Sequence, residues 1–188
     1  TQKLDIYGPR KKLRNGNACV IWIHAGALTG GDKQDDLPPY VVEKLLERDI
    51  VLVSPNYAVC TKTGEPNGGV PVNYPIFTSG AGFGSTEDSN YNLVPSSIAP
   101  FRLGNGKENA FTDAVRIVQF IKHHADTYNI DKDHIVLAAG AAGADLTSWL
   151  AMAPEVSAIT SDPVEAESIK VYAASNRNVI SNWLTWFP

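Results

Sequence analysis

The stretch Ile135–Leu146 reads IVLAAGAAGADL and decides the fold. Its first five residues are apolar, which is typical of a buried strand. Residues 139 to 143 read Ala-Gly-Ala-Ala-Gly and are small enough to form a tight turn. A helix is expected to follow from Asp145 to Met152. The sequence therefore predicts a sharp strand-to-helix turn with Ala141 at its apex.

Strand and helix patterns alternate on both sides of this turn. Apolar runs and Gly/Pro boundaries predict strands at residues 4–7, 18–24, 50–54, 135–139 and 169–173. Apolar residues at helical spacing predict helices at 40–48 and 108–128, and a turn is expected at 131–134. This alternation predicts an α/β fold with a doubly wound, mostly parallel sheet that has helices on its faces.

Length, composition and charge narrow the classes of function. The 188 residues form a single expected domain, 1–188, with 44% hydrophobic and 19% charged residues and a net charge of −4. The sequence has no basic stripe, so nucleic acid is not an expected partner. Its apolar runs are shorter than the roughly 20 residues that a membrane span requires. A soluble globular protein is expected, and the sequence does not specify its oligomeric state.

A Gly-, Pro- and Asn-rich insertion is expected at residues 61–107, between a strand and the long helix. A segment of this length without a periodic pattern is often a functional lid. Its aromatic residues either line a substrate cleft or anchor the insertion, and the sequence leaves both interpretations open; they are Tyr74, Phe77, Phe83, Tyr91 and Phe101.

The two cysteines carry little functional signal. Cys19 lies in an apolar run and is expected to be a buried small hydrophobe. A Cys19–Cys60 disulfide is the less favoured alternative to two thiols. No spacing of cysteine or histidine residues suggests a metal site, and no cofactor is implied.

Three segments together resemble the α/β-hydrolase superfamily, and within it the type-B carboxylesterases and related bacterial esterases. The first segment, VIWIHAGALTGGDK at 20–33, is similar to a strand followed by the family's His-Gly-Gly-Gly loop. The second, VLVSPNYAV at 51–59, is similar to a strand ending in Asn-Tyr-Arg. The third, Asn109–Leu146, contains a helix, a strand and a turn similar to the G-x-S-x-G nucleophile elbow.

The resemblance implies an ester site and assigns its parts. Position 141 would attack the ester, and three backbone N–H groups would bind the oxyanion of the tetrahedral intermediate. The ligand would be a small-molecule ester. By resemblance the oxyanion donors are Gly26, Ala27 and Ala142, and the residues that shape the two turns are His24, Gly140 and Gly143. His24 is expected to be a structural residue and not the catalytic base.

The chain departs from the family pattern at reactive positions. Alanine replaces the nucleophilic serine at Ala141, and it also replaces a loop glycine at Ala25, the arginine at Ala58 and the first elbow glycine at Ala139. The acid and the histidine of a triad would follow later strands. The chain is therefore expected to be incomplete at the C-terminal end, with both residues beyond Pro188.

Three hypotheses fit these departures. The first is a carboxylic-ester hydrolase that is inactive because its nucleophile position holds alanine. The second is a natural pseudoenzyme that uses the site for binding or assembly. The third is a doubly wound domain of another type that binds an anion at the helix N-terminus near Asp145.

Overall fold

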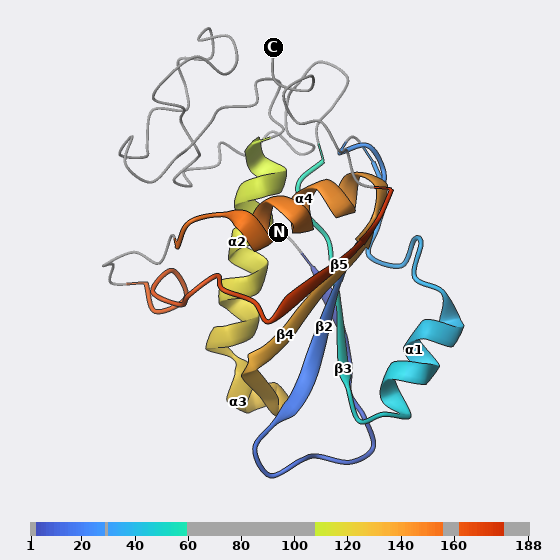
Figure 1. The fold of residues 1–188 in the computed structure, drawn as a ribbon, viewed down its shortest axis with the longest axis vertical. Helices are drawn as coiled ribbons and strands as arrows, with labels where there is room; N and C mark the ends of the chain where they lie inside the picture. The colour runs from blue at the N-terminus through green and yellow to red at the C-terminus, as the bar shows by residue number, and fades with distance from the viewer. Residues whose placement is uncertain (1–2, 29, 60–107, 156–161, 179–188) are drawn as a thin grey trace, which may run out of the picture.

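The computed structural model describes residues 3–28, 30–59, 108–155 and 162–178. Figure 1 shows a sheet with helices on both sides. The strands are β1 (Leu4–Tyr7), β2 (Asn17–Ile23), β3 (Val51–Pro55), β4 (Ile130–Gly140) and β5 (Ala173–Arg177). The helices are α1 (Pro39–Leu46), α2 (Glu108–His123), α3 (Ala125–Tyr128) and α4 (Ala141–Met152).

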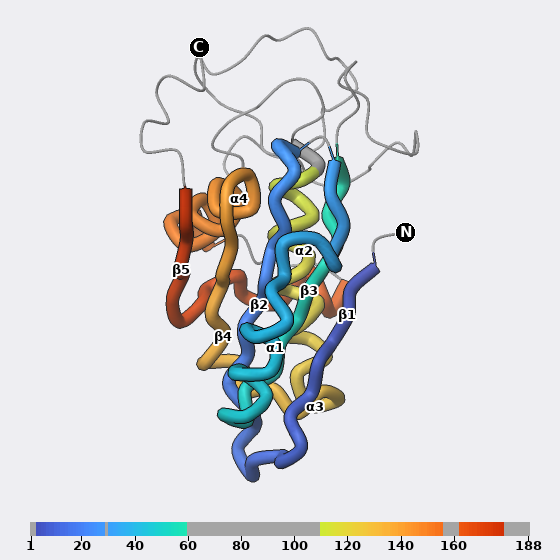
Figure 2. Tube along the Cα trace, turned by 90° about the vertical axis from the view of Figure 1, so that its right-hand side faces the viewer, coloured from blue at the N-terminus to red at the C-terminus, as the bar shows by residue number. Residues whose placement is uncertain are grey.

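The sheet has the strand order β1-β3-β2-β4-β5, which is visible in Figure 2. β1 runs antiparallel to β3, and the other pairs are parallel. The three strands β3, β2 and β4 therefore end at the same edge of the sheet. The loops that follow their carboxyl ends meet at that edge, where open α/β sheets bind ligands.

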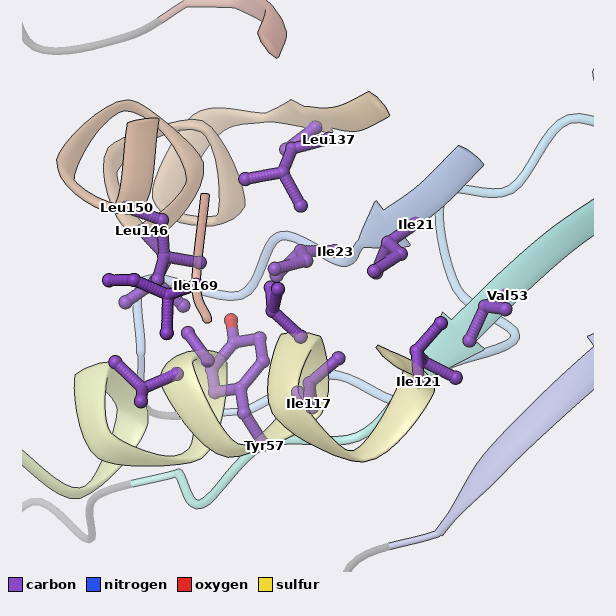
Figure 3. Packing of buried hydrophobic residues seen from close by; sticks show 14 of the residues in the cluster. Ile21, Ile23, Val53, Tyr57, Ile117, Ile121, Leu137, Leu146, Leu150 and Ile169 are labelled. Carbon is purple, nitrogen blue, oxygen red and sulfur yellow. The ribbon is translucent and has the colours of Figure 1, made fainter. Parts of the chain in front are cut away.

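The core lies between the sheet and the helices α2 and α4 (Figure 3). Every second residue of β2 is fully buried, because successive side chains of a strand point to opposite faces. Ile21 and Ile23 of β2 contribute to a cluster with Ile121 of α2 and Leu146 of α4. The opposite face carries α1, which contacts β3. The predicted α/β architecture with a mostly parallel sheet is confirmed.

Most predicted elements agree with the structure, and the long helix is the first exception. The predicted helix at 108–128 is divided at His124 into α2 and α3. α3 then ends at Asn129, which adopts a left-handed conformation with φ of 56°. Asparagine tolerates this conformation and is therefore common at the C-terminal end of a helix.

The predicted turn at 131–134 lies inside β4. Asn17 pairs with Ile130 and Cys19 pairs with Ile135, so the register shifts and residues 131–134 form an irregular bulge. The backbone N–H of Asp133 donates to the Asp131 carboxylate over 2.9 Å, which is the local bond of an Asx turn. The turn chemistry was predicted, but the strand continues through it.

The strand predicted at 169–173 is wrong in position, since β5 spans Ala173–Arg177. The reason is that α2 binds the backbone before β5. Gln119 donates to the carbonyl oxygens of Glu165 and Glu167 over 3.0 and 3.1 Å. Lys122 donates to the carbonyl oxygen of Lys170 over 2.5 Å. These backbone groups are satisfied by side chains instead of by a neighbouring strand.

Other predictions concern Cys19, the insertion and membrane spans. Cys19 is a free, buried thiol, and burial raises its pKa to about 12. The insertion at 61–107, with Cys60, lies outside the described residues. Among the residues that the structure describes, no helix is long and apolar enough to cross a membrane.

Candidate functional site

The junction of β4 and α4 has the geometry of a nucleophile elbow. Gly140 is the last residue of β4 and is extended, with φ of −130° and ψ of 157°. Ala141 follows with φ of 48°, a left-handed conformation that L-residues other than glycine seldom adopt. Ala141 is also exposed, whereas Ala142 to Thr147 are buried. The strained residue therefore presents its side chain at the surface of the turn, where a nucleophile would stand.

The helix α4 begins at Ala141, four residues before the predicted start at Asp145. The prediction took the small residues of the turn as non-helical. Instead, the turn is a single residue, and the alanines and glycine after it already belong to the helix. Asp145 is buried one turn inside α4 and does not lie at its N-terminus.

Gly143 allows the first turn of α4 to press against the end of β2. A Cβ atom at Gly143 would lie 2.3 Å from the carbonyl oxygen of Ile23 and 2.7 Å from that of His24. These are backbone atoms at the end of a central strand and in the residue after it, so they cannot move aside as a flexible side chain can. Gly140 differs, because a Cβ there would meet only the carbonyl oxygen of Arg177, at 3.9 Å. The contact at Gly143 brings the elbow against the residues that precede Gly26 and Ala27.

The loop after β2 holds an unusual backbone conformation. Gly26 and Gly31 have φ values of 125° and 101°, and a Cβ at Gly26 would overlap the carbonyl oxygen of Gly30 at 2.0 Å. Ala27 and Leu28 are also left-handed, with φ of 55° and 61°. Each such non-glycine residue costs about 1–2 kcal/mol. Leu28 is fully buried and anchors the loop, while Gly26 and Ala27 are exposed.

His24 is buried between this loop and Tyr57. Its ring stacks on the Tyr57 ring with a centroid distance of 4.3 Å, and the Tyr57 hydroxyl donates to the His24 carbonyl oxygen over 3.1 Å. The His24 Nδ1 atom lies 2.6 Å from the Ala25 carbonyl oxygen. Because a carbonyl oxygen only accepts, Nδ1 carries a proton. Within the part of the chain that the structure describes, the buried Nε2 atom has no hydrogen-bond partner.

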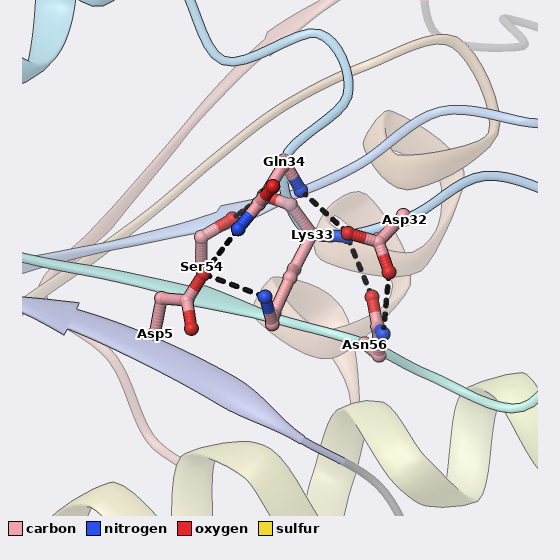
Figure 4. Close-up of polar contacts among 6 residues, drawn as sticks. All are labelled: Asp5, Asp32, Lys33, Gln34, Ser54 and Asn56. Carbon is pink, nitrogen blue, oxygen red and sulfur yellow. Dashed lines mark hydrogen bonds and ion pairs between the residues drawn. The ribbon is translucent and has the colours of Figure 1, made fainter.

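A polar cluster joins the far part of the loop to β1 and β3 (Figure 4). Lys33 forms an ion pair of 2.6 Å with Asp5. The hydrogen bond between these two side chains lowers the pKa of Asp5 and raises the pKa of Lys33. The side chain of Asn56 donates to the Asp32 carboxylate over 3.0 Å, which lowers the pKa of Asp32. Both carboxylates are therefore held in their charged form.

The structure thus places Gly26, Ala27 and Ala142 on two segments that contact each other, through Gly143. Asn56 and Asp32 were not among the residues predicted from the sequence for this region. A usable signal was present, because polar residues directly after a buried strand lie at the ligand-binding edge of a parallel sheet. Among the described residues, no cluster of three or more His, Cys, Asp or Glu side chains is arranged to hold a metal ion.

Solved structures with a similar fold include esterases from the Planctomycetes species Thermogutta terrifontis. The butyrate-bound Est2 structure has a TM-score of 0.62 and 16% identity, over 95% of this chain and 49% of that chain. The cyclosarin-phosphonylated esterase 2 has a TM-score of 0.60 and 18% identity, over 95% of this chain and 52% of that chain. This chain therefore spans about half the length of these neighbours. At this level of identity the likeness shows the fold alone.

A family comparison extends the assignment from fold to sequence. No curated protein matches the chain. The sequence model of the BD-FAE family, a group of esterase-like α/β-hydrolases, matches residues 4–68 and 91–186. These ranges include the loop after β2, the end of β3 and the elbow, and they cover most of the chain. The chain belongs to the BD-FAE family of esterase-like α/β-hydrolases.

Proposed function

We propose that this chain carries the oxyanion loop and the nucleophile elbow of a carboxylic-ester hydrolase, which is inactive because its nucleophile position holds alanine. The observation that carries the proposal is the conformation of Ala141. A left-handed, exposed residue between a strand and a helix is the position at which α/β-hydrolases hold their nucleophile. The methyl group of alanine cannot attack a carbonyl carbon, so no acyl-enzyme forms at this position.

The proposed division of roles follows from the backbone geometry. The N–H group of Ala142 lies in the first turn of α4, where helix N–H groups have no partner within the helix. The N–H groups of Gly26 and Ala27 belong to the exposed part of the loop after β2. In an ester site these three groups would bind the carbonyl oxygen of the ester, as donors do in an oxyanion hole. A histidine and an acid would have to come from other segments of the whole protein.

One experiment with a matched control tests this function on the whole protein. The Ala141→Ser variant is expected to hydrolyse short-acyl p-nitrophenyl esters, because it restores the missing hydroxyl on an existing elbow. Propionyl and butyryl esters are the first choice, since Est2 of Thermogutta terrifontis has been solved with propionate and butyrate bound. The matched control is Ala142→Ser, which places the same hydroxyl on the buried neighbouring position and is expected to stay inactive.

The alternative within the same family is a pseudoenzyme that uses the site for binding or assembly. What favours it is that several departures from the family pattern cluster at reactive positions, namely at Ala25, Ala58, Ala139 and Ala141. An Ala141→Ser variant that folds and binds butyrate but does not hydrolyse its ester would favour this alternative. The third hypothesis, a doubly wound domain of another type, is replaced by the family assignment.

A further inference from the structure

The loop between β2 and α1 needs external support to keep its shape. Ala27, Leu28 and Asp36 are left-handed residues that carry side chains, with φ of 55°, 61° and 59°. Such conformations persist only where the surrounding structure imposes them. The contacts that impose them therefore decide where the N–H groups of Gly26 and Ala27 point.

The end of β3 supplies these contacts at both ends of the loop. The Tyr57 hydroxyl donates to the carbonyl oxygen of His24 over 3.1 Å, at the loop's beginning. The Ser54 hydroxyl donates to the carbonyl oxygen of Lys33 over 2.5 Å. The Asn56 side-chain oxygen accepts from the backbone N–H of Lys33 over 2.5 Å. Three residues within a span of four thus bind the backbone of the loop.

Asn56 differs from Ser54 and Tyr57 because its side chain forms two hydrogen bonds with the loop, one through the amide oxygen and one through the amide nitrogen. Its oxygen accepts from the Lys33 N–H, and its nitrogen donates to Asp32 Oδ2 over 3.0 Å. Asp32 Oδ1 in turn accepts from the backbone N–H of Gln34 over 3.1 Å. A carboxylate at position 56 has no donor and would face the Asp32 carboxylate directly. The arrangement therefore requires an amide opposite an acid (Figure 4).

We propose that Asn56 is a positioning residue of the ester site, which sets the direction of the Gly26 and Ala27 N–H groups by pairing with Asp32 and Lys33. This inference rests on the proposed function for its chemical meaning. Asn56 acts through the loop, because a shift at residues 32–33 is transmitted along a short backbone that is also held at His24.

The first test uses backbone amide NMR on the chain with Ala141 unchanged. Asn56→Asp keeps the size of the side chain, removes the donor and adds a charge opposite Asp32. We expect it to shift the Gly26 and Ala27 amide signals and to speed their hydrogen exchange at least tenfold. Adding Asp32→Asn reverses the pair, so that the amide at 32 donates to the acid at 56. The double variant is expected to restore the signals of the parent.

A matched control separates positioning from a general loss of stability. Asn129 also donates its side-chain amide, to the Asn17 side chain over 2.6 Å, next to Gly16 and Leu13 at the opposite end of the sheet. Asn129→Asp is expected to destabilise the fold and to leave the Gly26 and Ala27 signals in place. Unchanged signals in Asn56→Asp, or no recovery in the double variant, would overturn the proposal. If Asn56→Asp does not fold, Asn56→Ala replaces it with the same expected displacement.

Kinetics in an Ala141→Ser background give the second readout. Because oxyanion contacts strengthen only in the transition state, Asn56→Asp is expected to lower kcat at least tenfold and to change KM less than twofold. Asp32→Asn should recover most of the lost kcat. An equal rise in KM with unchanged kcat would contradict a positioning role. If Ala141→Ser has no hydrolytic activity, the proposed function fails, and the NMR result still decides the role of Asn56.

Discussion

Replacing Gly143 by alanine is expected to destabilise the protein, although alanine is the better helix former. Within a helix, alanine is favoured over glycine by about 1 kcal/mol. The added Cβ would lie 2.3 Å from the Ile23 carbonyl oxygen, about 1 Å closer than ordinary contact allows. Overpacking a rigid site costs about 1–3 kcal/mol and occasionally more. Both opposing atoms are backbone atoms, one from the last residue of the central strand β2 and one from the residue after it, so we expect the upper end of this range and a net loss of about 2 kcal/mol.

Gly140→Ala is the matched control at the other glycine of the elbow. Here the new Cβ has open space, and the backbone φ of −130° suits any residue. The lower entropy of the unfolded chain favours alanine by about 0.4–1 kcal/mol, and the loss of glycine at the N-cap opposes it by a similar amount. We expect a change within about 0.5 kcal/mol. Urea unfolding followed by circular dichroism measures both variants. A Gly143→Ala variant as stable as the parent would refute the close contact between α4 and β2.

Two further predictions concern titration and thiol chemistry. Hydrogen bonds from Lys33, His134 and Arg116 lower the pKa values of Asp5, Asp131 and Asp162, respectively. The stability that these pairs contribute is therefore complete above the ordinary carboxyl pKa of about 4, and it is lost as the pH falls through the lowered pKa values. Urea midpoints measured from pH 6 to pH 2 test this loss. In a Cys60→Ser background, buried Cys19 should react with a thiol reagent at pH 8 only after unfolding, and rapid labelling of the native protein would contradict its burial.

The sequence was sufficient to predict those elements whose hydrophobic pattern matches their final burial. β2 and β3 are apolar because they are central parallel strands, and α2 shows helical spacing because one side faces the sheet. β5 was placed too early because Ile169 is buried although it is not in a strand. Side chains of α2 satisfy the backbone around it, and such long-range contacts leave no local signal in the sequence.

The candidate site also has some features that the sequence predicted and others that depend on long-range contacts. Gly26 and Gly143 were assigned through the family resemblance, and the structure gives the overlaps that a Cβ would cause at each position. The left-handed conformations of Ala27 and Leu28 were not predicted, since neither residue prefers them. The backbone on either side of these two residues, at His24 and Lys33, accepts hydrogen bonds from Tyr57 and Ser54, which lie more than twenty residues further along the chain.

The conformation of Ala141 shows that the shape of the elbow does not depend on the reactive hydroxyl. A left-handed alanine costs about 1–2 kcal/mol, and this alanine forms no side-chain hydrogen bond that would offset the cost. The strain must therefore come from the contacts around it. β4 fixes Gly140 through its pairing with β5, and Gly143 fixes the start of α4 against β2. With both neighbours held, residue 141 alone must absorb the change of direction. The same packing would hold a serine side chain at position 141 in this exposed conformation, which is why a single substitution is expected to be enough to test the proposed site.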